Sequence, residues 1–159
     1  MPSETLVVGP NTGVKGSVIL IEGVGGGRKA EGGLILDNAH GFLGPRPIFN
    51  SALSVKGRVV DVTTRLGQPG VVKVLCDVHT HMTVWIVVHD SPYFAVTDDQ
   101  GHFKIDGIPP WEYWVTMWHE GFTPKGVDKD GRPVYEEWRL QREVTIPRGG
   151  SAAVDFEIK

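Results

Sequence analysis

The sequence predicts an all-β protein, and three observations lead to this fold class. Glycine and proline are frequent, with 21 and 11 copies among 159 residues, and both are spread along the whole chain. Runs of β-branched and aromatic residues recur about every 8–12 residues, with turn residues between them. We find no segment with the 3.6-residue apolar period of an amphipathic helix. Short strands joined by turns are therefore expected to form a Greek-key β-sandwich or barrel.

The first half of the chain contains five short apolar or alternating runs that predict strands. They occupy residues 14–21, 34–36, 58–64, 71–75 and 83–88. The glycine-rich segment Gly23–Gly33 lacks the spacing of a phosphate-binding loop, and no helix pattern follows it, so we expect a plain loop. The segment Gly41–Pro47 is rich in turn residues.

The second half of the chain predicts five further strands. They occupy residues 93–97, 102–105, 113–118, 143–146 and 153–158. The segment Asp98–Gly101 predicts a hairpin turn, because Gly101 stands where a positive φ is needed. We expect a bend at Ile108–Pro110 and a polar loop at Val127–Val134.

A change in composition at Asp90–Pro92 separates these two halves. The segment is too short for a flexible linker. We therefore expect two β modules, residues 1–90 and residues 91–159. The second should be a small β-sandwich packed on the first as one compact body.

Charge and hydropathy exclude several classes of partner. The net charge is −3, and no basic stripe with interleaved aromatic residues predicts a nucleic-acid surface. No apolar run reaches the roughly 18–20 residues of a membrane-spanning helix. The segment Met1–Leu6 has neither the basic start nor the apolar core of a secretory signal. A single cysteine, Cys76, rules out a disulfide within the chain.

One segment carries a pattern of metal-binding residues. Cys76, His79 and Met82 have the spacing C-x2-H-x2-M between the predicted strands 71–75 and 83–88. A thiolate, an imidazole and a thioether on one tight loop are a soft ligand set that favours copper. His81 lies two residues beyond His79 and would share its side of an extended backbone, as a further ligand or as an exposed side chain.

This loop resembles the ligand loop of small cupredoxins such as amicyanin and pseudoazurin. The resemblance implies that Cys76 is the thiolate ligand, His79 an imidazole ligand and Met82 the axial ligand of one mononuclear copper site. The family's remaining ligand is a histidine followed by asparagine, and this chain has Asp37 before an asparagine, with His40 three residues later. His40 or Asp37 is thus expected to complete the set, and an aspartate would make the site harder and shift it from a blue centre.

The longer stretch Val74–Glu120 is similar to bacterial secreted proteins of plastocyanin-like or carboxypeptidase-regulatory-like type. The similarity rests on the Cys-Asp-x-His loop, the glycine hairpin, the pair Pro109–Pro110 and the ending Trp118-His119-Glu120. Where the pattern has a glycine after the two prolines, this chain has Trp111. The resemblance implies a cupredoxin-like module joined to a transthyretin-like β module that has no catalysis of its own.

The function expected from these resemblances is electron transfer or copper handling in the periplasm or outside the cell. A redox protein such as a multihaem cytochrome is the implied partner. We do not expect an enzyme, because the G-x-S-x-G and H-E-x-x-H motifs are absent and no pair of carboxylates stands out.

A second hypothesis is a metal-free interaction module, favoured by Asp37 in place of a histidine. Cys76 would then be a small buried apolar residue. Trp111, Trp114 and Trp138 would form the surface that docks on a larger complex.

Overall fold

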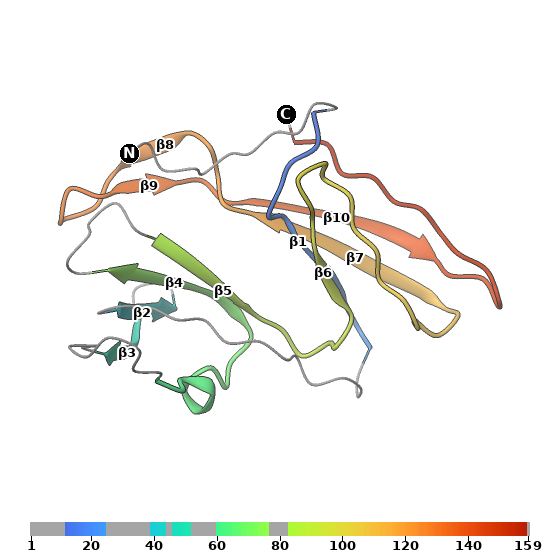
Figure 1. Ribbon diagram of the computed structural model, residues 1–159, viewed down its shortest axis with the longest axis horizontal. Helices are drawn as coiled ribbons and strands as arrows, with labels where there is room; N and C mark the ends of the chain where they lie inside the picture. Colours follow the sequence, from blue (N-terminus) through green and yellow to red (C-terminus); the bar gives the residue numbers. More distant parts are fainter. Residues whose placement is uncertain (1–11, 25–38, 44–45, 52–59, 77–82, 159) are drawn as a thin grey trace. The chain divides into compact units, whose positions relative to one another are not determined.

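A computed structural model describes residues 12–24, 39–43, 46–51, 60–76 and 83–158 of the chain. Within these ranges every regular element is a β-strand, apart from one 3-10 turn, η1 (Thr63–Arg65), so the prediction of an all-β protein is confirmed. The strands form two four-stranded sheets and one two-stranded sheet, all antiparallel (Figure 1). None of these sheets closes into a barrel among the described strands. The described ranges also hold no helix with the length and hydropathy needed to cross a bilayer.

The chain divides into two compact units, each described by itself. One unit lies within residues 30–90, and the other joins residues 2–29 to residues 91–159. The sequence prediction placed residues 1–90 in one module, whereas strand β1 (Val18–Ile21) pairs with strands of the second unit. The first strand of the chain therefore completes the sheet of the C-terminal half.

The sheet of the first unit has the order β3-β2-β4-β5. Its strands are β2 (Ala39–Leu43), β3 (Arg46–Ser51), β4 (Gly70–Cys76) and β5 (Thr83–Val88). In β4 every second residue, Val72, Val74 and Cys76, is buried, as the period of a strand with one core face requires. Val72 and Val74 form the core with Phe49 of β3, and apolar residues of β5 pack against them.

Strands β2 and β3 extend into the turn-rich segment 41–47 from its two ends, and neither strand was predicted from the sequence. Gly41 sits inside β2 because a Cβ there would lie 2.2 Å from Cε1 of Phe49. The glycine is thus a packing requirement within a strand and not a turn residue. The strand predicted over 58–64 is absent from the described part of that segment, where the 3-10 turn η1 begins at Thr63. The Thr63 N–H donates to Asp61 Oδ1 at 2.8 Å. The strand predicted over 34–36 lies outside the described residues.

The main sheet of the second unit has the order β10-β7-β1-β6 (Figure 1). Besides β1, its strands are β6 (Phe94–Val96), β7 (Glu112–His119) and β10 (Trp138–Thr145). A separate hairpin joins β8 (Pro124–Val127) to β9 (Pro133–Tyr135). One face of the main sheet carries the buried core, formed by Ile19, Ile21, Tyr113, Val115 and Met117.

Two of the strands predicted for this unit do not pair. Residues 102–105 and 153–158 carry no strand in the structure, although their apolar side chains do pack against the core. The alternation of apolar and polar residues in 153–158 matches which of its side chains pack on the core, Val154, Phe156 and Ile158. It could not predict whether a neighbouring strand would satisfy the backbone, because that depends on distant parts of the chain.

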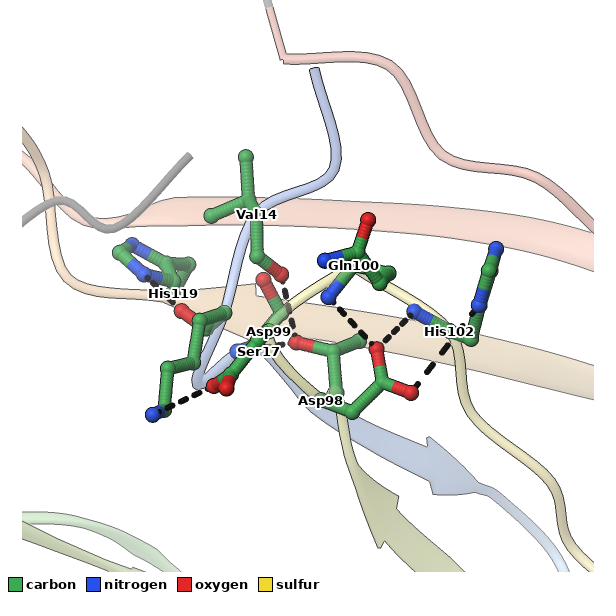
Figure 2. A network of polar contacts seen from close by, with 9 residues as sticks. Val14, Ser17, Asp98, Asp99, Gln100, His102 and His119 are labelled. Atoms are coloured by element: carbon green, nitrogen blue, oxygen red, sulfur yellow. Dashed lines mark hydrogen bonds and ion pairs between the residues drawn. The ribbon is translucent and has the colours of Figure 1, made fainter. Parts of the chain in front are cut away.

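The turn predicted at Asp98–Gly101 is present, although no return strand follows it (Figure 2). The Gly101 N–H donates to the Asp98 carbonyl at 3.0 Å, and Gly101 has a φ of +77°. One carboxylate oxygen of Asp98 accepts from the backbone N–H groups of Gln100 at 2.8 Å and His102 at 2.9 Å. These hydrogen bonds, first that of His102 and then that of Gln100, hold the pKa of Asp98 below its ordinary value.

Candidate metal centre

Cys76 is the last residue of β4, the strand that lies between β2 and β5 in the first unit. Cys76 is 7% exposed, and its side chain lies on the same face of the strand as those of the buried residues Val72 and Val74. Strand β2 pairs with Cys76 itself, and strand β5 pairs up to Leu75, the residue directly before it. The two neighbouring strands thus fix the backbone at this end of β4. A cysteine sulfur is thus held at the end of a rigid strand, beside an apolar core.

The start of β2 lies at the same end of this sheet. Ala39 pairs with Cys76, and His40 pairs with Leu75. The backbone of His40 therefore directly follows Ala39, the residue that lies opposite Cys76. Ala39 of β2 and Leu75 of β4 are 36 residues apart in the sequence, and the antiparallel pairing of the two strands brings their ends together.

The other predicted ligands fall on residues that the structure does not describe. They are Asp37, His79, His81 and Met82. Among the described residues no three His, Cys, Asp or Glu side chains converge as a metal site would require. That result does not bear on the predicted set, because Cys76 alone among its six members has a side chain that the structure describes.

The structure describes the strands on both sides of the predicted ligand loop. Cys76 is a buried sulfur donor where β4 ends, and β5 begins seven residues later at Thr83, so the intervening residues connect two neighbouring antiparallel strands. On the opposite face from Cys76, the Lys73 ammonium lies 5.5 Å from the ring centroid of Trp85. Lys73 and Trp85 are directly paired across β4 and β5, so this contact braces the same two strands.

His119 is the most buried of the histidines whose side chains the structure describes, and its ring contacts residues of the second unit. It is 5% exposed on β7. Its Nδ1 contacts the Glu120 carbonyl oxygen, and its Nε2 lies 3.3 Å from the Lys15 carbonyl oxygen. Both contacts of the His119 ring are with backbone oxygens of the second unit, which agrees with a role in holding β7.

The three tryptophans of the alternative docking surface do not share one face. Trp111 and Trp114 are 72% and 52% exposed. Trp138 pairs with His119, whereas Trp114 lies at an alternate position of β7, on the opposite face of the sheet. A surface made of all three is therefore excluded, and Trp111 and Trp114 remain as its exposed aromatic residues.

A cleft in the second unit was not foreseen in the sequence. It lies between residues 101–108 and residues 150–155 and has a volume of about 470 Å³. The apolar alternation of both segments led to the expectation of paired strands, which would leave no such opening. Only the pairing pattern of the folded chain discloses it.

No family model, curated protein or solved structure matches the chain.

Proposed function

We propose that the first unit is a cupredoxin-like copper-binding domain that acts in electron transfer or copper handling. Cys76, His79 and Met82 would supply the thiolate, imidazole and thioether ligands, and His40 or Asp37 would complete the set, with His81 beside it. Copper bound there would supply a one-electron redox couple. We propose no catalytic residue, because the chemistry needs no substrate.

The observation that supports this proposal most strongly is the position of Cys76. It is buried at the end of β4, the start of β2 pairs opposite it, and β5 returns beside it. A ligand loop between two paired strands keeps its ligands in place when the charge of a bound ion changes, which favours fast electron transfer.

The proposed partner is a redox protein such as a multihaem cytochrome, and the proposed compartment is the periplasm or the cell exterior. Both follow from the resemblance of the ligand loop to cupredoxins. A second unit of transthyretin-like type, residues 91–159 with β1, would serve as a non-catalytic module.

Copper reconstitution of the full chain tests the proposal. We expect one copper per chain and a visible thiolate-to-copper charge-transfer band after excess metal is removed. Replacing the sulfur in Cys76→Ser should abolish the band and reduce retained copper, because serine is a hard and weak ligand for this ion. Copper analysis and visible spectroscopy measure both effects.

A matched control uses His102→Gln, since His102 is exposed on a turn of the second unit. This variant should bind copper like the wild type. Circular dichroism of Cys76→Ser checks that its sheets remain folded. A wild-type chain that retains no copper, or a band that persists in Cys76→Ser, would contradict the proposal.

The alternative function is a metal-free interaction module, and the exposure of Trp111 and Trp114 favours it. Both indoles lie in or beside β7, and exposed tryptophan is enriched at protein interfaces. Absence of stoichiometric copper after reconstitution, with full folding, would leave this alternative as the better account.

A further inference from the structure

Two extended segments of the second unit run over the core face of its main sheet. Within these segments the exposure alternates over residues 103–106 and 153–158, with apolar side chains toward the core and polar or small ones toward solvent. The inward side chains that pack on the core are Phe103, Ile105, Ile108, Val154 and Phe156. Alternation of this kind is the pattern of a strand in a two-layered sandwich.

Neither segment has the backbone hydrogen bonds of a strand. Among the described residues, no backbone N–H or carbonyl of 103–108 or 151–156 pairs with another backbone group. Most backbone groups near a core are paired in folded proteins, and an unpaired extended edge is a template for another strand. Each segment therefore presents a row of unused donors and acceptors.

The cleft of about 470 Å³ lies between these two rows. Apolar side chains of the main sheet line it, among them Ile21, Val115 and Val144. Its volume is within the range of about 300–1,000 Å³ that is usual for binding sites. The apolar side chains of the main sheet thus form the floor of this cleft, and the two unpaired segments form its sides.

We propose that this cleft binds an extended peptide segment, which adds as a β-strand along the unpaired backbone. Its apolar side chains, at every second position, would enter the cleft above Val115, and its amides would pair with the flanking segments. A compact apolar molecule would fill the volume but leave both rows of backbone groups unpaired. The backbone requirement therefore selects a strand as the occupant.

The charges around the cleft add a constraint on this peptide. The exposed residues of the two segments include Lys104, Asp106 and Asp155, which carry opposite signs. Such a rim favours no strongly charged partner. The expected ligand alternates apolar residues with small neutral polar ones, and its binding is independent of the proposed copper site.

A synthetic probe tests the proposal on the full chain. The probe is a fluorescein-labelled acetyl-Ser-Val-Thr-Val-Thr-Val-Ser-amide, and fluorescence anisotropy measures its dissociation constant. We expect saturable binding of one peptide per chain. A matched peptide with N-methyl groups on alternate residues lacks the donors of one edge, and its affinity should be weaker by about tenfold or more.

Two neighbouring alanines supply a matched pair of variants. Ala152 and Ala153 are both exposed, and neither makes a backbone hydrogen bond among the described residues. Successive N–H groups of an extended chain point to opposite edges. One of Ala152→Pro and Ala153→Pro should therefore weaken peptide binding several-fold and the other should not, with similar melting temperatures for both.

Four outcomes would overturn the proposal. The first is failure of the probe to bind, and the second is equal binding of the N-methylated peptide. The third is slow amide hydrogen exchange at 103–108 and 151–156 in the unbound protein, which would show that the two segments already pair with each other. The fourth is a concentration-dependent dimer that the probe dissociates, which would make a second copy of the chain the occupant.

Discussion

The Thr97 side chain connects two segments that are far apart in the sequence. Its hydroxyl oxygen accepts from the Ser17 N–H at 2.9 Å, and the same hydroxyl donates to the Val14 carbonyl at 2.7 Å. Both Ser17 and Thr97 are buried. One side chain therefore satisfies two backbone groups at the point where the chain enters β1, next to β6.

Thr97→Val keeps the shape of the side chain and removes this hydroxyl. We expect the free energy of unfolding to fall by about 1–3 kcal/mol, because a buried N–H and a carbonyl lose their partner. Chemical denaturation measures the change. Thr145→Val, at an exposed position of β10, is the matched control and should stay within about 0.5 kcal/mol of the wild type. Equal effects of the two substitutions would refute this role of the hydroxyl.

Asp98 gives the protein a defined acid sensitivity. The backbone N–H groups of His102 and Gln100 lower its pKa from 3.8 in the folded chain. A carboxyl group with a lowered folded pKa stabilises the fold above its unfolded pKa, and this contribution is lost as the pH falls through the folded pKa. The stabilisation from Asp98 is thus complete near neutrality and begins to fade below pH 3.8.

An NMR titration of the Asp98 carboxyl carbon measures this directly. We expect its midpoint below 3.8 in the folded protein. Asp98→Asn should be less stable than the wild type at neutral pH, with a difference that shrinks in strong acid. A midpoint at or above 3.8, or a difference independent of pH, would contradict the hydrogen-bonded turn.

At the scale of elements, two turns of the second unit have the same construction. In Asp98–His102 and in Asp128–Arg132, the aspartate N–H donates to the carbonyl four residues later, and the glycine N–H donates back to the aspartate carbonyl. In both turns one aspartate oxygen accepts two backbone N–H groups. Gly101 and Gly131 have nearly equal φ angles of +77° and +75°.

The two glycines differ only in what surrounds them, which allows a matched comparison. A Cβ on Gly101 would lie 2.7 Å from Gly13 Cα, whereas a Cβ on Gly131 would meet nothing within 4 Å. Gly131→Ala should cost about 1–2 kcal/mol for the left-handed conformation alone. Gly101→Ala should cost clearly more, because the backbone at Gly13 must also move. Thermal unfolding of both variants measures the difference, and equal losses would contradict the close approach.

The elements show which features a single sequence can predict. Apolar, β-branched and aromatic runs located β1, β4, β5, β6 and β7, and the alternation at 143–146 located the end of β10. The same reasoning missed β2 and β3, since Gly41 and Pro47 are turn residues in isolation and only the Phe49 ring explains the glycine. Pairing was the least predictable property, as the unpaired segments at 103–108 and 151–156 illustrate.

At the scale of the whole molecule, the chain consists of two units with separate roles in the proposed function. The division is not the one expected, because β1 belongs to the sheet of the C-terminal half. The apolar run Val18–Ile21 predicts a strand but not the sheet that it joins. The sequence therefore predicts two modules but cannot assign the strand Val18–Ile21 to its sheet.

The candidate site was predictable only in part. The sequence located Cys76 at the end of a core strand, and the structure agrees. It also paired this cysteine with the segment around His40, and the register of β2 on β4 is compatible with that idea. The remaining ligands, Asp37, His79, His81 and Met82, stay predictions, since they fall outside the described residues.

The ligand set is the central claim, and X-ray absorption at the copper edge of the reconstituted protein tests it most directly. The account predicts a short copper–sulfur scattering path together with imidazole scattering, and loss of the short sulfur path in Cys76→Ser. A spectrum of the wild-type protein with nitrogen and oxygen neighbours alone would contradict it.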